Sequence, residues 1–152
     1  MCLWFKKIKT VDDLVAKCKD YQSVARWIRW HIFETKPLHG SWPTSKEVLK
    51  KRKTWCKGFA VLTCAALKKL GHDPKLVSFM WRDKDHELIA HVVCTYKDGE
   101  TYHYIDNGVP HHCSVAQQSL KDVAVFACPG KVYSAYERDG EGNLVNILIS
   151  GV

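Results

Sequence analysis

Apolar residues recur at helical spacing along the first part of the chain. Their spacing predicts helices over residues 11–19 and 23–34. Thr10 and Asp13 form a capping box in front of the first helix, because each can bond the backbone N–H of the other. We therefore expect the chain to start with two helices.

A loop and a short helix come next. Pro37, Gly40 and Pro43 break the helical pattern and predict the loop. Thr44 and Glu47 then form a second capping box, which predicts a short basic helix.

Residues 55–70 have the clearest helical pattern. Apolar residues recur there every three or four positions, and Gly71 supplies the left-handed residue that often ends a helix. The pattern predicts a largely buried helix. It begins at Cys56 or within a residue of it.

The pattern changes to that of strands in the second half. β-Branched and aromatic residues between turn signals predict strands over 75–81, 88–96, 101–106, 131–137 and 144–149. Ser114 with Gln117 suggests one short helix, and residues 139–143 form a plausible hairpin turn. Helices followed by strands predict an α+β fold with the residue-56 helix packed on a mainly antiparallel sheet.

Cys56 is the candidate nucleophile. A cysteine at a helix N-terminus faces unpaired N–H groups and the positive end of the helix dipole, which favour a thiolate. Lys53 and Lys57 would add to this effect if they point toward the sulfur. Cys64, deeper in the same helix, and Cys94 in a strand are interpreted as ordinary core thiols.

One predicted hairpin brings a histidine beside an aspartate. Asp98-Gly99 is a strong signal for a two-residue turn between the second and third strands. A turn there would place His91 directly opposite Asp106 on one face of the sheet. The carboxylate could then hold the imidazole as a base, whereas a one-residue slip would separate them.

Composition favours one domain with reduced thiols. The 152 residues are 46% hydrophobic, so we expect residues 1–152 to fold as a single domain. The seven cysteines are an odd number without framework spacing or a CxxC pair. No apolar stretch has the length or flanks of a signal peptide or a membrane span, so we expect a cytoplasmic protein without a membrane partner.

The net charge of +7 is unevenly distributed. Residues 1–57 contain 14 Lys and Arg against 5 Asp and Glu, a net charge of +9, and the rest contain 9 against 11, a net charge of −2. Such asymmetry can attract nucleic acid, but no nucleic-acid motif accompanies it. We therefore favour a solvated helical surface over nucleic-acid binding.

His111-His112-Cys113 places three possible metal ligands together. Adjacent residues seldom point at one ion, and no second pair at ligand spacing supports them. We expect no metal and no other cofactor.

Three segments resemble the transglutaminase-like superfamily, a papain-like group that includes small bacterial and viral cysteine peptidases. Residues 42–60, with Trp55-Cys56-Lys57-Gly58, are similar to its lead-in and nucleophile helix. Residues 90–93 resemble its histidine strand and residues 104–108 its aspartate strand, in the same order. The motif-bearing core spans roughly residues 40–110, judged from motif spacing.

The resemblance implies a catalytic triad of Cys56, His91 and Asp106. The backbone N–H of Cys56 is the first candidate for binding an oxyanion, because of its place on the helix. Trp42 and Trp55 are further candidates for the oxyanion site or the substrate cleft.

The implied activity is thiol-dependent hydrolysis of amide bonds in a protein or peptide substrate, through an acyl-enzyme. Resolution by water makes a peptidase or deamidase, and resolution by an amine makes a transglutaminase. The sequence does not separate these outcomes. A third alternative is a non-catalytic binding module that uses its basic N-terminal region to engage a partner.

Overall fold

The computed structural model describes residues 7–37, 40–113 and 117–151. The first half of the chain is mainly helical, with α1 (Val11–Lys17), α2 (Tyr21–His31), α3 (Ser45–Lys51) and α4 (Cys56–Lys69). Two short strands, β1 (Phe33–Glu34) and β2 (Lys53–Thr54), pair in parallel beside them.

The second half of the chain forms the main sheet. Its strands are β3 (Lys75–Arg82), β4 (Leu88–Asp98), β5 (Thr101–Asp106), β6 (Val109–His111), β7 (Val132–Arg138) and β8 (Leu144–Ile149). Their order within the described residues is β6-β5-β4-β3-β7-β8, and every neighbouring pair is antiparallel. The predicted α+β fold with a mainly antiparallel sheet is confirmed.

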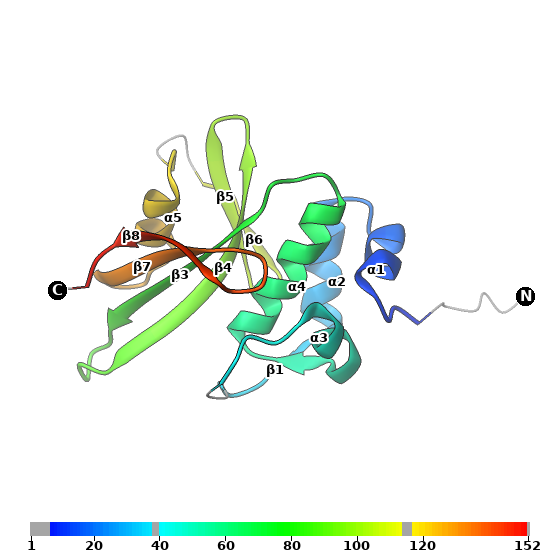
Figure 1. Ribbon diagram of the computed structural model, residues 1–152, viewed down its shortest axis with the longest axis horizontal. Helices are drawn as coiled ribbons and strands as arrows, with labels where there is room; N and C mark the ends of the chain where they lie inside the picture. The colour runs from blue at the N-terminus through cyan, green and yellow to red at the C-terminus, as the bar shows by residue number, and fades with distance from the viewer. Residues whose placement is uncertain (1–6, 38–39, 114–116, 152) are drawn as a thin grey trace, which may run out of the picture.

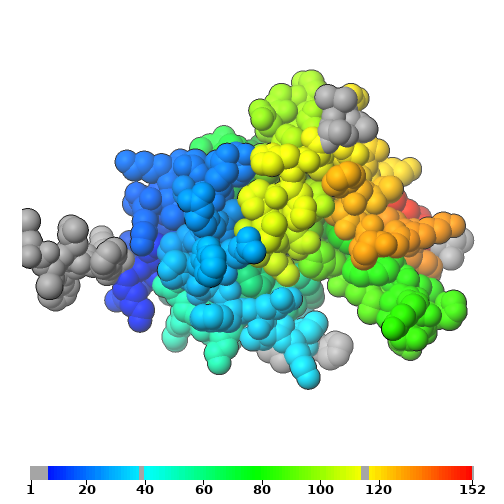
Figure 2. Space-filling model, turned by 180° about the vertical axis from the view of Figure 1, so that it is seen from behind, coloured from blue at the N-terminus to red at the C-terminus, as the bar shows by residue number. Residues whose placement is uncertain are grey.

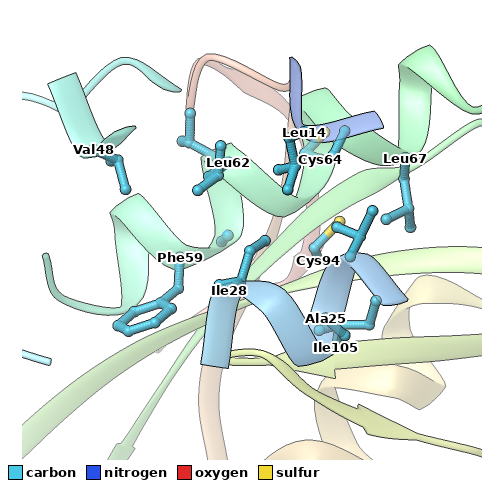
Figure 3. Packing of buried hydrophobic residues seen from close by; sticks show 14 of the residues in the cluster. Leu14, Ala25, Ile28, Val48, Phe59, Leu62, Cys64, Leu67, Cys94 and Ile105 are labelled. Carbon is cyan, nitrogen blue, oxygen red and sulfur yellow. The ribbon is translucent and has the colours of Figure 1, made fainter. Parts of the chain in front are cut away.

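Helices lie on both sides of this sheet (Figure 1). The first four helices pack on one side, where Leu62 and Leu67 of α4 meet Cys94 and Ile105 of the sheet (Figure 3). The last helix, α5 (Leu120–Ala127), covers the other side. The result is a sheet between two apolar layers, which is how an α+β domain buries both faces of its strands.

The predicted helix starts are largely confirmed. Both capping boxes form, with Thr10 bonded to Asp13 and Thr44 bonded to Glu47. The second helix starts earlier than predicted, at Tyr21, and ends at His31 rather than near residue 34. Its start is set by the side chain of Asp20, which accepts a hydrogen bond from the N–H of Ser23 at 2.7 Å.

The helix predicted from Ser114 and Gln117 has a different start. Ser114 lies outside the described residues, and Gln117 precedes a helix that begins at Leu120. Ser119 and Asp122 form its capping box. This box has the same Ser/Thr-x-x-Asp pattern as Thr10 and Asp13, and it sets the helix N-cap at Ser119, five residues after Ser114.

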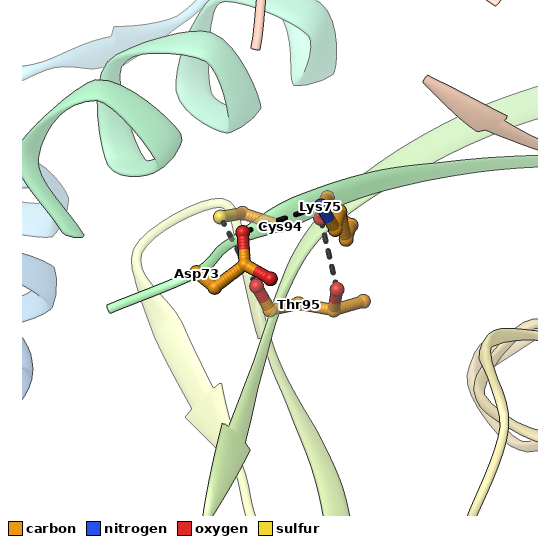
Figure 4. Close-up of polar contacts among 4 residues, drawn as sticks. All are labelled: Asp73, Lys75, Cys94 and Thr95. Carbon is orange, nitrogen blue, oxygen red and sulfur yellow. Dashed lines mark hydrogen bonds and ion pairs between the residues drawn. The ribbon is translucent and has the colours of Figure 1, made fainter. Parts of the chain in front are cut away.

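A hydrogen bond between side chain and backbone holds β4 in register with β3. The hydroxyl of buried Thr95 donates to the carbonyl oxygen of Lys75 at 2.9 Å (Figure 4). The two residues are Cα partners at one end of the ladder, and the same register pairs Phe79 with His91 further along. The position of His91 beside β3 therefore depends on this ladder.

Candidate active site

Cys56 is the first residue of α4, as the sequence predicts. Trp55 is the N-cap residue, and its extended backbone makes no side-chain cap bond. The helix is buried along most of its length, while Cys56 itself is partly exposed. The sulfur is thus carried by a fixed element and remains accessible, which a nucleophile requires.

The predicted register of the β4–β5 hairpin is wrong by two residues. The turn consists of Gly99 and Glu100, and Asp98 pairs with Thr101. Gly99 has a φ of +60°, the conformation that a type II′ turn requires of its first central residue. The sequence prediction assumed the other common two-residue turn, with Asp98 and Gly99 in the centre.

The shift by two residues leaves His91 and Asp106 on the same face, because side chains alternate with a period of two. The ladder between β4 and β5 runs from Cys94–Ile105 to Asp98–Thr101, and extending it sets Asp106 opposite position 93. His91 and Asp106 are therefore diagonal neighbours rather than direct partners. Diagonal neighbours remain within reach of long side chains.

A tight turn after Asp106 fixes the end of β5. Asn107 and Gly108 both have positive φ, and Asp106 pairs with Val109 across them. A Cβ at Gly108 would lie 2.9 Å from the backbone nitrogen of Arg29 in α2, so glycine is required by the close approach. In the view from behind, the blue residues of α2 adjoin the yellow residues of this segment (Figure 2).

The structure brings Cys56, His91 and Asp106 together. Nε2 of His91 lies 2.7 Å from Oδ1 of Asp106, and their side chains are 22% and 31% exposed. Cys56 and His91 line the same pocket, and Cys56 is among the neighbours that raise the pKa of the imidazole. Since Asp106 occupies Nε2, Nδ1 is the nitrogen left for the thiol.

These neighbours determine the charge of the imidazole. Burial lowers the pKa of His91, but the hydrogen bonds to Asp106 and Cys56 and the charges of both outweigh it and raise the pKa to about 10. His91 is therefore protonated at neutral pH. A cationic imidazole next to a cysteine is the arrangement that favours an imidazolium–thiolate pair.

Two other cysteines near α4 lie in the core. Cys64 is 3% exposed and Cys94 is fully buried, both among apolar side chains (Figure 3). The thiol of Cys94 faces the carbonyl oxygen of Thr95 at 3.9 Å, and burial raises its pKa (Figure 4). Among these three thiols, only Cys56 is placed to react with a molecule from solvent.

A pocket of about 510 Å³ opens at Cys56 and His91. Trp42 and Trp55, the two predicted cleft residues, line it. Phe79 also lines it and meets the His91 ring edge-on, with 5.7 Å between ring centroids. The pocket is mostly apolar around a few polar groups, as is usual for a site that orients a bound molecule.

Backbone donors at the start of α4 are available beside the sulfur. Gly58 and Phe59 both donate to the carbonyl of Trp55, whereas the N–H groups of Cys56 and Lys57 donate to no acceptor within the described residues. Unpaired N–H groups at a helix start can bind an anion. This geometry fits the oxyanion role expected of the Cys56 N–H.

Comparisons with known proteins identify the family. Residues 5–119 match a family described as "Transglutaminase-like domain". The chain belongs to this family. No match was found among curated proteins.

One solved structure has a similar fold, and two others superpose less well. Calcium-bound LapG of Legionella pneumophila superposes with a TM-score of 0.52 at 16% identity, over 83% of this chain and 69% of that one. A candidate cysteine protease from Cytophaga hutchinsonii gives 0.48 at 14% identity, over 68% and 39%. A protein described as a TGase gives 0.47 at 16%, over 74% and 38%.

The pocket at Cys56 and His91 is also lined by residues that were not predicted from the sequence. Ser78 of β3 and Tyr136 and Arg138 of β7 line its wall. Tyr136 and Arg138 lie beyond the matched residues 5–119. No sequence signal indicated them, because β7 reaches the site only through its pairing with β3.

The possible metal ligands at 111–113 have separate neighbours. His111 stacks on Tyr104, with 4.6 Å between ring centroids. The ring of His112 instead approaches Tyr21 and His103. No group of three or more His, Cys, Asp or Glu side chains with metal-site geometry occurs within residues 7–37, 40–113 and 117–151.

Membrane spans were also sought in the described part of the chain. None of its helices combines the length and the apolar character that crossing a bilayer requires.

Proposed function

We propose that this transglutaminase-like protein hydrolyses amide bonds of a protein or peptide, with Cys56 as nucleophile, His91 as acid and base, and Asp106 as the residue that orients His91. The observation that carries the proposal is that His91 bonds Asp106 at 2.7 Å and lines the same pocket as Cys56. The family supports a thiol-dependent enzyme, and the specific reaction is our inference.

The chemistry starts from the imidazolium–thiolate pair. Sγ of Cys56 attacks the amide carbonyl, and the oxyanion that forms is bound by the free N–H groups at the start of α4. His91 then gives its proton to the leaving amine, and a thioester remains on Cys56. Water attacks the thioester while His91 takes a proton from the water, which releases the acid and restores the imidazolium–thiolate pair.

Acyl transfer to an amine is the second candidate, and it is favoured by the family description. Both reactions share the thioester, so they differ only in the molecule that resolves it. Incubation with a glutamine peptide and a labelled amine separates them. Both reactions release ammonia when the thioester forms, so incorporation of the amine in preference to formation of the free acid would support transfer.

Reactivity of the individual thiols tests the proposal. We expect iodoacetamide to alkylate Cys56 at neutral pH much faster than Cys64 or Cys94, because only Cys56 is accessible and paired with an imidazolium. Mass spectrometry of tryptic peptides gives the rate for each site. His91→Ala should slow the labelling of Cys56 and leave that of the two buried thiols unchanged.

Equal reactivity of the three thiols would instead support a binding module without catalysis. For turnover, we expect Cys56→Ala and His91→Ala to abolish activity and Asp106→Ala to reduce it less. Activity retained by Cys56→Ala would overturn the assignment.

We further propose a cytoplasmic location and a protein or peptide as the partner. The location is supported by the odd number of cysteines without framework spacing. Fractionation of cells with detection of the protein tests it.

A further inference from the structure

Besides His91, two cations line the pocket of Cys56, and no acidic side chain lines it within the described residues. Lys57 follows Cys56 on α4, and Arg138 ends β7. Neither makes an ion pair within the described part of the chain. Glu141, in the loop after β7, lines a different pocket.

Both cations lie against the ring of Trp42. Nζ of Lys57 is 5.1 Å from the ring centroid, and the guanidinium carbon of Arg138 is 5.5 Å from it. A cation over an aromatic face is attracted to the ring and keeps its charge. Trp42 therefore contacts two positive charges that line the pocket.

The guanidinium of Arg138 is further fixed by hydrogen bonds. Its Nε donates to Oγ of Ser78 at 2.9 Å, and one Nη donates to the carbonyl of Gly142 at 3.0 Å. It also lies over the ring of Tyr136, at 5.6 Å from the centroid. The other Nη of Arg138 has no acceptor among the described residues. The guanidinium is therefore fixed in place and still has N–H groups free to donate. Such a group binds a carboxylate with little loss of side-chain freedom.

We propose that Lys57 and Arg138, set against Trp42, bind an acidic side chain of the substrate close to the bond that Cys56 attacks. This inference rests on the proposed function and names its substrate class, peptides with Asp or Glu beside the scissile amide. The ligand chemistry is a carboxylate. We assign this carboxylate to a side chain of the substrate. Lys57 directly follows the nucleophile in the chain, so the carboxylate that it binds lies next to the carbonyl that Cys56 attacks.

Matched electrophilic peptides test the preference. The probes are peptide vinyl sulfones with Glu or Gln at one of the two residues before the electrophile, and the readout is the second-order rate of Cys56 modification. We expect Glu to exceed Gln by about tenfold at low salt, the scale of one charge-assisted hydrogen bond. Added salt should reduce the ratio, because it screens partly exposed charges.

The ratio of the two rates, measured within each variant, cancels any change in the reactivity of the sulfur. Arg138→Gln and Lys57→Gln should each lower the ratio toward one, and Arg138→Lys should restore part of it. Lys53→Gln and Arg82→Gln remove charges that do not line the pocket, and should leave the ratio unchanged. Circular dichroism of each variant checks the fold.

Competing peptides distinguish the two sources of a carboxylate. A capped peptide with an internal Glu should slow labelling by iodoacetamide, and its Gln analogue should not. Protection only by peptides with a free C-terminal carboxylate would overturn the assignment to a side chain. Rapid labelling with equal Glu and Gln rates overturns this inference alone. Labelling of Cys56 no faster than that of Cys64 overturns the proposed function as well.

Discussion

Replacing Asp106 with asparagine should lower the pKa of His91 while keeping the size of the side chain. The carboxylate oxygen lies 2.7 Å from Nε2, and both side chains are at least two-thirds buried. A hydrogen bond to a charged group contributes about 1.5–3 kcal/mol, and one pKa unit corresponds to about 1.4 kcal/mol. The pKa of His91 should therefore fall by about one to two units.

The same substitution changes how stability depends on pH. The pKa of folded His91, about 10, lies above the ordinary value of 6.5, so the bound proton stabilises the folded state. This contribution is fully present below pH 6.5 and is lost as the pH rises through about 10. The free energy of unfolding of the wild type should therefore fall more between neutral pH and pH 10 than that of Asp106→Asn.

Titration by NMR measures the effect directly. The Cε1–H shift of His91 is followed against pH, and a His91→Gln variant identifies the signal among the eight histidines. Asp12→Asn, which removes a carboxylate paired with Lys69 on the surface, is the control and should leave the pKa of His91 unchanged. An unchanged pKa of His91 in Asp106→Asn would refute the reasoning, because the hydrogen bond to the carboxylate could not then be raising it.

Three further predictions concern stability in urea unfolding. Leu62→Ala empties a fully buried site and should lower the free energy of unfolding by about 2–5 kcal/mol. Leu144→Ala, at a 55% exposed site, should lower it by about 0.5 kcal/mol or less. Equal losses in the two variants would contradict the assigned core. Gly108→Ala strains a positive φ against α2 and should cost about 1–3 kcal/mol, and a neutral effect would exclude the close approach. Thr95→Val removes the bond to Lys75 and should cost about 1 kcal/mol, and greater stability would show that this bond contributes nothing.

Local chemistry made much of the fold predictable from the sequence. The capping boxes at Thr10 and Thr44 define helix starts through contacts three residues apart, and both form. Gly71 ends α4 with a φ of +90°, as expected. Interactions between near neighbours depend little on the rest of the chain, so they can be read from the residues alone. The start of α4 at Cys56 was predicted from the spacing of apolar residues instead, since Trp55 makes no side-chain cap bond.

Longer-range features were predictable only in part. The β4–β5 turn lies one residue later than predicted, which moves the strand register by two, because Asp98-Gly99 and Gly99-Glu100 both satisfy a two-residue hairpin. His91 and Asp106 are still neighbours, as predicted, because an even shift of the register keeps both side chains on the same face of the sheet. An odd shift would have separated them.

The sequence by itself determined most of the helices, the five longest strands and the pattern that places Cys56, His91 and Asp106 in one family order. Tertiary structure alone decided which side chains surround them. Arg138 reaches the pocket because β7 pairs with β3 rather than following β6 in the sheet, and Trp42 meets it from a loop nearly a hundred residues away. Contacts between such distant residues depend on strand order and packing of the whole domain, and no local propensity specifies them.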